Sequence, residues 1–307
     1  MVYRTGSGKL IKKNFLTGEY VIYSLDRAKR PQNIKKDILT TPIKLCPFCI
    51  ENKHMTSEPI YKSFNDEIRL IYNKYPITQY DTENYGIHYV LIDTKDHEKN
   101  IINYTDEHMF YLMKCIKDIL NMLYEDKKLK YVQVFKNQGI NAGASQSHSH
   151  WQILGLYILP NKQKYMINAL KSYEKQYGKC YFCNMDYSQN LVYENNDFIA
   201  FCPNDSLYCY EINIIPKHHI TNVRYLNDEM LASLGAILKK CIIKLNLIHN
   251  NLDYNICLYN GFRKEDEYHF FLQIIPRVGS LAGFEFSTGM FVNSILPLDA
   301  AKNLRLV

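Results

Sequence analysis

The chain repeats one pattern of landmarks twice, and this repeat constrains its fold more than any other feature of the 307 residues. Each copy begins with a Cys-x-x-Cys pair; the two pairs are Cys46/Cys49 and Cys180/Cys183. After each pair come a strand-like segment that ends in a histidine, a helical pattern, and two further strand-like segments. The same order at nearly constant spacing indicates two copies of one α+β unit, residues 1–165 and 166–307.

The helices and strands expected in the two copies match in position. Thr105 and Asn227 are good N-cap residues, and each is followed by an acidic pair where negative charge favours the helix dipole. Apolar residues at helical spacing then occupy 109–123 and 231–245. The strand-like segments after them are 131–139 and 148–154 in the first copy, and 254–261 and 269–275 in the second. We therefore expect an antiparallel sheet in each unit, with helices packed on one face.

Each copy also contains the four side chains of a structural zinc site. Two thiolates and two imidazoles suit a tetrahedral Zn²⁺ ion, and four protein ligands leave no open position for catalysis. The predicted ligands are Cys46, Cys49, His97 and His148 in the first copy, and Cys180, Cys183, His219 and His269 in the second. His218 is an alternative to its neighbour His219. The Cys pairs could instead be redox-active or incidental, but the histidines that the repeat supplies favour zinc.

Composition limits the class of protein. Charged residues at 22% and hydrophobic residues at 47% argue against a disordered chain, and nine Cys, an odd number, argue against a complete disulfide framework. The first thirteen residues lack the apolar stretch of a signal peptide, and no apolar run approaches the roughly 18 residues of a membrane span, so we expect a cytoplasmic protein. The net charge of +6 comes from scattered residues, which suits a phosphate-bearing ligand and does not imply nucleic acid.

The segment 143–153 contains the candidate nucleophile. If residues 148–154 form a strand, alternation places His148, His150 and Gln152 on one face. With His148 bound to metal, His150 would be held beside it as a neutral imidazole, which is an effective nucleophile towards phosphorus at neutral pH. Gln152 could donate its amide to an anionic oxygen. The loop before the strand predicts a phosphate cradle with free N–H groups, built from Gly139, Gly143, Ser145 and Ser147.

A His-x-His pair on a strand is more often metal-binding than nucleophilic, so both histidines could be ligands or plain polar strand residues. The second copy favours catalysis by one of them. It keeps His269 and Gln273 but has Phe271 where the first copy has His150. A residue that only one copy carries is not needed for metal binding. We therefore expect one catalytic unit and one scaffold unit.

A His-x-His-x-Gln strand with a phosphate-attacking histidine resembles the HIT superfamily, in particular its duplicated branch containing galactose-1-phosphate uridylyltransferase and ADP-glucose phosphorylase. The similarity extends over nearly the whole chain. Its segments are 15–33, the CPFC motif at 46–49, the nucleophile segment 136–153, and the tail 284–305, which is closer to phosphorylase-like members. The resemblance implies duplicated HIT-like units, antiparallel sheets joined into a half-barrel, and a homodimer.

The resemblance also implies roles for individual residues. His150 would form a covalent nucleotidyl-imidazole with the α-phosphate of a nucleotide sugar, and Gln152 and Ser145 would bind that phosphate. Asn137 would contact the nucleotide, and two arginines would approach its diphosphate, a solvated basic patch being the alternative for these two. The arginines are Arg27 and Arg30, and the residues implied for the acceptor pocket are Glu285, Thr288 and Gly289.

The expected function is nucleotidyl transfer by double displacement, from a nucleotide sugar to a sugar 1-phosphate, as in galactose-1-phosphate uridylyltransferase. An ADP-glucose or dinucleotide phosphorylase, with orthophosphate as acceptor, is the alternative within the same chemistry. A catalytically inactive, zinc-stabilised nucleotide-binding protein is the alternative from another class. Two departures from the family pattern, Trp151 for a small residue and Ser149 for proline, leave the substrate more open than the reaction.

Overall fold

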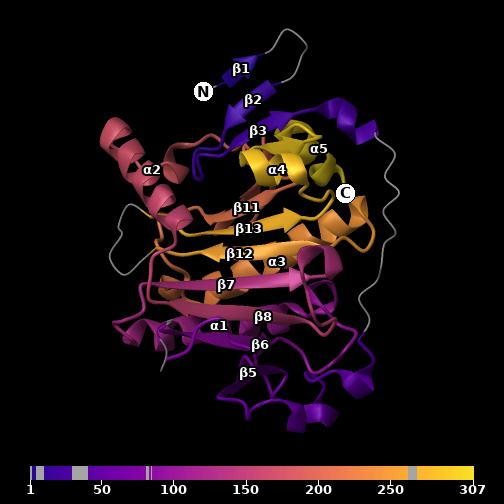
Figure 1. The fold of residues 1–307 in the computed structure, drawn as a ribbon. Helices are drawn as coiled ribbons and strands as arrows, with labels where there is room; N and C mark the ends of the chain where they lie inside the picture. Colours follow the sequence, from indigo (N-terminus) through magenta and orange to yellow (C-terminus); the bar gives the residue numbers. More distant parts are fainter. Residues whose placement is uncertain (1, 5–9, 30–40, 81–82, 84, 262–267) are drawn as a thin grey trace.

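A ten-stranded sheet forms the centre of the protein, as Figure 1 shows. The computed structural model describes residues 2–4, 10–29, 41–80, 83, 85–261 and 268–307. Within these residues the strands of the large sheet are, in spatial order, β4 (Tyr61–Ser63), β5 (Ile68–Tyr72), β6 (Gly86–Ile92), β8 (His150–Leu156), β7 (Tyr131–Gln138), β12 (Tyr254–Tyr259), β13 (Phe271–Pro276), β11 (Ile212–Pro216), β10 (Phe198–Phe201) and β9 (Leu191–Glu194).

The large sheet contains one arrangement of five strands twice. Counted inwards from each edge, β4-β5-β6-β8-β7 in the first half corresponds to β9-β10-β11-β13-β12 in the second. The halves meet where β7 pairs with β12 in antiparallel register, with Asn137 opposite Asn255. In the described chain the edge strands β4 and β9 do not pair with each other, so the sheet is open. The predicted antiparallel α+β arrangement, present twice, is confirmed, and the unit boundaries 1–165 and 166–307 stay a prediction.

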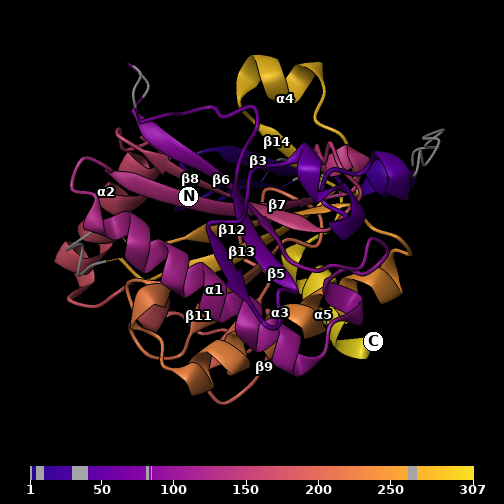
Figure 2. The ribbon, with the colours of Figure 1, turned by 90° about the horizontal axis from the view of Figure 1, so that it is seen from below.

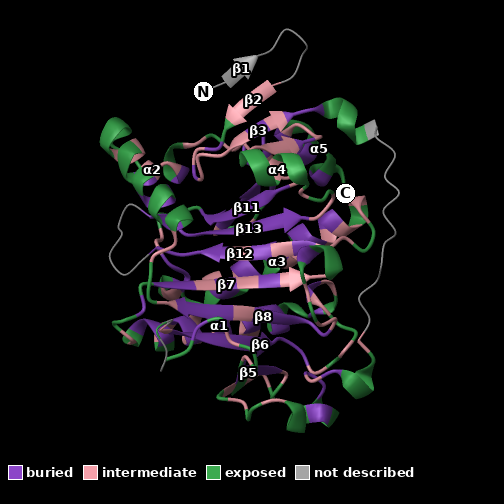
Figure 3. Ribbon diagram, viewed as in Figure 1, coloured by how far each residue is buried: buried purple, intermediate pink, exposed green. Residues whose placement is uncertain are grey.

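Two long helices cover one face of the large sheet. They are α1 (Asp106–Glu125) and α3 (Asp228–Ile248), which lie side by side in Figure 2. Their predicted caps are confirmed, because the Thr105 side chain accepts the N–H of His108 at 3.1 Å and the Asn227 side chain accepts that of Met230 at 2.8 Å. Their apolar sides and the strands beneath form the main core, which Figure 3 shows as the buried centre of the sheet.

The other face of the sheet carries a helix that the repeat does not predict. Helix α2 (Asn161–Tyr177) packs Met166, Ile167 and Leu170 against Phe271 of β13, whereas we expected helices on one face alone. The other α-helices of the described residues, both near the end of the chain, are α4 (Gly283–Thr288) and α5 (Pro297–Leu306). Among the described residues, no helix combines the length and the apolar character that crossing a membrane needs.

A four-stranded sheet joins the two ends of the chain. Its strands are, in order, β1 (Val2–Arg4), β2 (Leu10–Lys13), β3 (Tyr20–Tyr23) and β14 (Phe291–Asn293). Strand β14 runs parallel to β3. The segment that includes β2 and β3 also contacts the second half of the chain. Tyr23 donates its hydroxyl to the carbonyl oxygen of Ser206, between β10 and β11, at 3.1 Å, and Leu16 packs with Phe271 of β13. The N-terminal segment therefore covers the second unit.

A buried ion pair lies under the strand that carries the candidate nucleophile. Lys136 of β7 and Asp93, which follows β6, are both fully buried with Nζ and Oδ2 3.2 Å apart. Lys136 Nζ also donates to Ser149 Oγ at 2.6 Å and to the carbonyl oxygen of His150 at 3.2 Å. The indole N–H of Trp151 donates to Asp93 Oδ2 at 3.1 Å. Trp151 thus belongs to the core on the α1 and α3 side, away from the face of His150.

Replacing Lys136 with methionine should lower the free energy of unfolding by about 3–5 kcal/mol, because the Asp93 carboxylate would stay buried without its counter-ion. The double variant Lys136→Met/Asp93→Asn should lose less, since the buried charge is then removed. Denaturant unfolding of both variants measures this. The exposed pair Lys62–Asp66 is the matched control, and Lys62→Met should cost about 0.5 kcal/mol or less. A Lys136→Met loss no larger than that of the control would contradict the prediction.

Candidate active site

His150 opens β8 and presents one ring nitrogen for chemistry. Its Nδ1 lies 2.9 Å from the carbonyl oxygen of His148, and because a carbonyl can only accept, Nδ1 carries the hydrogen. Nε2 is therefore left with a free lone pair. Burial, and after it the positive charge of Lys136, lowers the pKa of His150 to about 4. The imidazole is neutral at neutral pH, which is the state a nucleophile needs.

A cavity of about 570 Å³ lies in front of His150. Gln152 and Ser145, which the sequence placed at a phosphate, line it together with His150. Apolar and aromatic side chains form other parts of the wall, among them Phe48, Ile71, Tyr72, Tyr75 and Val90. A concave, largely apolar site with a few convergent polar groups is typical of a small-molecule binding site.

The four predicted ligands of the first copy converge beside the cavity. Donor atoms of Cys46, Cys49, His97 and His148 all lie within 4.8 Å of one another. His148 Nδ1 lies 3.6 Å from both thiols, and tetrahedral zinc, with bonds of about 2.3 Å to sulfur and 2.0–2.1 Å to nitrogen, implies the same separation of about 3.6 Å. His148 Nε2 lies 2.8 Å from the carbonyl oxygen of Thr94, which places the ring hydrogen there and leaves Nδ1 for a metal.

The second copy repeats this geometry. Its group consists of Cys180, Cys183, His219 and His269, so His219 and not its neighbour His218 belongs to it. His269 Nδ1 lies 3.6 and 3.5 Å from the two thiols, and its Nε2 lies 3.0 Å from the carbonyl oxygen of Pro216. Cys183 and His219 are exposed, whereas the first group is mostly buried. Both Cys₂His₂ groups could hold a metal ion, and neither includes His150.

The loop before β8 differs from the predicted phosphate cradle. The N–H groups of residues 141–144 already donate within the protein, to Asp253 Oδ2 and to the carbonyl oxygens of Gly139 and Ile140. The expectation of free N–H groups is therefore wrong for these residues, because a 3₁₀ turn over Ile140–Ala142 uses them. Ser145 reaches the cavity, while Gly143 ends that turn in the left-handed conformation, with φ of 80°.

The structure does not bring the remaining predicted residues to this cavity. Asn137 accepts a hydrogen bond from Asn255 at 2.8 Å, and Arg27 is exposed in a 3₁₀ turn at Leu25–Lys29. The other predicted arginine, Arg30, lies outside the described residues. Glu285, Thr288 and Gly289 shape α4 itself, through a bond from the Ala282 N–H to Glu285 Oε2, one from Thr288 Oγ1 to the Phe284 carbonyl, and a left-handed C-cap at Gly289. In Figure 2 this helix projects from the body of the protein.

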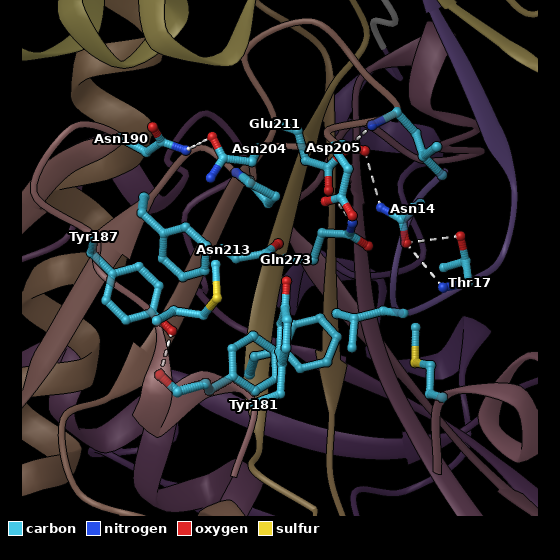
Figure 4. Close-up of a pocket in the computed structure, with 18 of the residues that line it drawn as sticks. Asn14, Thr17, Tyr181, Tyr187, Asn190, Asn204, Asp205, Glu211, Asn213 and Gln273 are labelled. Carbon is cyan, nitrogen blue, oxygen red and sulfur yellow. Dashed lines mark hydrogen bonds between the residues drawn. The ribbon is translucent and has the colours of Figure 1, made fainter. Parts of the chain in front are cut away.

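The second copy has only a remnant of the cavity, shown in Figure 4. Its volume is about 30 Å³, enough for a water molecule. Phe271 stacks on Tyr259, with ring centroids 4.6 Å apart, and packs with Leu16 and Met166. These apolar side chains occupy the space that is open beside His150. Only the first unit can therefore take a nucleotide-sized ligand at this position.

Sequence reasoning missed several residues of the site. Lys136, paired with Asp93, donates to the backbone of the strand that carries His150, and His88 of β6 contacts Gln152 with 2.9 Å between Nε2 and Oε1. Alternation within β6 places His88 on the same face as Val90, but only the register of the structure places Val90 opposite Gln152. The register that pairs β6 with β8 was not visible in the sequence.

Alanine at Gly139 should destabilise the loop, because a Cβ there would overlap the carboxylate of Asp253 and φ is 86°. We expect a loss of about 3 kcal/mol or more in the free energy of unfolding. Gly143 is the matched control, since its φ is 80° but a Cβ would meet open space. Gly143→Ala should cost about 1–2 kcal/mol. Equal losses in the two variants, measured by denaturant unfolding, would show that neither the Asp253 carboxylate nor the extended backbone of Gly139, with ψ of 165° against 22° at Gly143, adds to the cost.

Known proteins resemble this chain over nearly its whole length. A family model described as "Domain of unknown function (DUF4931) N-terminal domain" matches residues 24–159. ADP-glucose phosphorylase of Arabidopsis thaliana is 30% identical over 97% of this chain and 92% of that protein. Galactose-1-phosphate uridylyltransferase of Thermotoga maritima is 26% identical over 96% of this chain and 97% of that protein. The crystal structure of the Arabidopsis ADP-glucose phosphorylase with bound ADP-glucose matches with a TM-score of 0.88 at 30% identity, over 97% and 98% of the two chains.

These similarities agree with the geometry of the site. The HIT-like fold is duplicated, one copy keeps a histidine with a free Nε2 on a cavity, and both copies keep a Cys₂His₂ group. The resemblance drawn from the sequence motifs is confirmed. The chain belongs to the branch of the HIT superfamily that contains galactose-1-phosphate uridylyltransferase and ADP-glucose phosphorylase, a branch of nucleotidyltransferase-type enzymes.

Proposed function

We propose that this protein transfers a nucleotidyl group from a nucleotide sugar by double displacement through His150. The observation that carries the proposal is the free Nε2 of a neutral, buried imidazole on a cavity of about 570 Å³, at a position where the second copy has Phe271. Metal binding does not explain His150, because both candidate metal groups are complete without it.

The chemistry proceeds in two balanced steps. In the first, the lone pair of Nε2 attacks the α-phosphorus, and the bond from that phosphorus to the bridging oxygen breaks, so that sugar 1-phosphate leaves with the electron pair. In the second, an oxygen of the acceptor phosphate attacks the same phosphorus and the P–N bond breaks, which restores the neutral imidazole. Throughout both steps Nδ1 would keep its hydrogen and donate it to the carbonyl oxygen of His148, a hydrogen bond that would stabilise the positive charge that the ring gains.

The other predicted residues serve the phosphates in this proposal. Gln152 and Ser145 line the cavity and would donate to the α-phosphate oxygens. Asn137, Arg27 and Arg30 are assigned to the nucleotide and its diphosphate by the resemblance, whereas Gly143 is assigned to the phosphate only as part of the loop before β8, where its N–H donates to the carbonyl oxygen of Ile140. Glu285, Thr288 and Gly289 keep their assignment to an acceptor pocket, which they would reach from the second chain of a homodimer. The exposed Phe286 on their helix, with 76% of its surface accessible, supports such a contact.

The acceptor is a sugar 1-phosphate in our main proposal, in a cytoplasmic galactose pathway. Galactose-1-phosphate uridylyltransferases are the more numerous of the curated relatives, which supports this choice. Orthophosphate is the second candidate, because the Arabidopsis ADP-glucose phosphorylase has the higher identity, 30% against 26%. The alternative from another class is a zinc-stabilised nucleotide-binding protein without turnover, and the experiment below distinguishes it from the enzyme.

Incubation with UDP-glucose or ADP-glucose should give a covalent nucleotidyl adduct that intact-mass spectrometry detects. His150→Ala should abolish it and lower turnover by at least about 10⁴-fold, since the group that forms the intermediate is lost. The matched control is Phe271→Leu, which changes the equivalent position of the second copy and should keep the adduct.

Addition of galactose 1-phosphate or orthophosphate to the isolated adduct then identifies the acceptor, because only the true acceptor should remove the nucleotidyl group quickly. An adduct that persists in His150→Ala would overturn the role of this residue. The absence of any adduct with the common nucleotide sugars would favour the binding protein.

We also propose that both Cys₂His₂ groups hold zinc, which ties each Cys loop to the end of a strand. Elemental analysis should find two zinc ions per chain, and one in either Cys46→Ala or Cys180→Ala. A chelator should remove the ion of the second group faster, since Cys183 and His219 are exposed while Cys46 and His148 are buried. The single-site variants identify which ion is lost. A zinc content well below two per chain would reject the paired sites.

A further inference from the structure

His88 on β6 contacts the glutamine beside the nucleophile. Its Nε2 lies 2.9 Å from Oε1 of Gln152, and the side chain is only 3% exposed. Strand β6 pairs with β8 so that Val90 stands opposite Gln152. Alternation therefore places His88 on the face that carries Gln152 and His150.

The surroundings of His88 determine its tautomer. The backbone N–H of Ile77 lies 3.2 Å from Nδ1, so Nδ1 must supply a lone pair. Burial lowers the pKa of His88 and keeps the ring neutral, which leaves its one hydrogen on Nε2. Nε2–H then donates to Oε1 of Gln152. Asn73 Nδ2 also lies 3.1 Å from Nε2, but a nitrogen that donates to Gln152 has no lone pair to accept from it.

The second copy makes the opposite bond at the same place. In β11, Asn213 stands opposite Gln273 as Val90 stands opposite Gln152, and Glu211 two residues earlier corresponds to His88. Glu211 accepts a hydrogen bond from Nε2 of Gln273 at 2.7 Å, while Oε1 of Gln273 accepts one from the Tyr259 hydroxyl at 3.2 Å. Figure 4 shows Glu211 and Gln273 together in the small pocket of this copy. The amide nitrogen that is left for a ligand in the first copy is bound by protein in the second.

We propose that His88 is a positioning residue that determines which end of the Gln152 amide faces the cavity. A donor at position 88 holds Oε1 and directs the Nε2 hydrogens of Gln152 towards phosphate oxygens. An acceptor there, as in Glu211, would hold the nitrogen and turn the carbonyl oxygen towards the same anion. This inference deepens the proposed function and rests on it, because the orientation of Gln152 matters only if a phosphate lies beside His150.

The expected effect follows from the loss of one donor to a phosphoryl group in transfer. Removing a single preorganised donor costs about 10²–10³-fold in rate in the enzymes where this has been tested. A reversed amide does more than remove the donor, because it also presents an oxygen to the negative phosphate. The residue at position 88 should therefore act on nucleotidyl transfer through Gln152 and have little direct contact with the reacting atoms.

The test compares His88→Glu, which copies the second unit, with His88→Gln, which keeps an N–H donor near the position of Nε2. The rate of adduct formation from UDP-glucose or ADP-glucose should fall at least about 100-fold in His88→Glu and stay within about tenfold in His88→Gln. His88→Leu, which adds no buried charge, should lie between them and covers the case in which His88→Glu folds poorly. Glu211→Gln is the control in the second copy and should keep the wild-type rate.

A double-mutant cycle with Gln152→Ala separates positioning from a general structural effect. In the Gln152→Ala background, His88→Glu should change the rate less than about twofold, because the amide through which it acts is gone. An equal loss in both backgrounds, or no loss in the wild-type background, would overturn the inference. If the wild-type protein itself formed no adduct, the proposed function would fail instead, so the two failures are distinguishable.

Discussion

The ion pair of Lys136 and Asp93 is the interaction on which the arrangement of β8, the strand that carries His150, depends. Both charges are fully buried, so each must be satisfied within the protein, and their contacts join β7, β8 and the turn after β6. Ser149 Oγ and the carbonyl oxygen of His150 accept from the same ammonium group. Lys136 therefore fixes the backbone between His148, which belongs to the candidate metal group, and His150, which does not. His150, the proposed nucleophile, is therefore held through its backbone by Lys136 and through Nδ1 by the His148 carbonyl, while its free Nε2 faces the cavity.

The two copies show how one scaffold can be used for two purposes. Strand order, helix caps and Cys₂His₂ geometry are common to both, so they serve the fold. The differences gather on one face of the sheet, at two equivalent positions and in the space in front of them. His150 is replaced by Phe271, His88 by Glu211, and the space in front is filled by Leu16 and by Met166 of α2. Catalysis needs the cavity, whereas the second copy gains a second apolar core from filling it.

The repeat explains how much of the site could be predicted from the sequence. A metal group needs four residues that lie far apart in the chain, and the duplicated order identified His97 and His148 without any knowledge of the fold. Helix caps at Thr105 and Asn227 are local patterns and were equally accessible. The partners of His88 and Lys136 depend on the register between neighbouring strands. A shift of one residue would move every side chain of a strand to the other face of the sheet, so no local sequence pattern identifies these partners. The placement of α2 and α4 depends on packing between segments that lie far apart in the sequence. Helix α2 lies on a face where we expected no helix, and the residues of α4 were singled out only by the family resemblance.

The low basicity of His150 suits a nucleophile that must also leave. A strongly basic imidazole would attack phosphorus well but would be protonated more often, and it would form a P–N bond that breaks slowly in the second step. Burial and the charge of Lys136 lower the pKa of the ring to about 4, which keeps the imidazole unprotonated and favours breakage of the P–N bond in the second step. The cost is a weaker attack, which preorganisation can offset: the ring is held by the His148 carbonyl, and the phosphate would be held by Gln152 and Ser145. The same buried ammonium that anchors the strand thus also tunes the group that the strand presents.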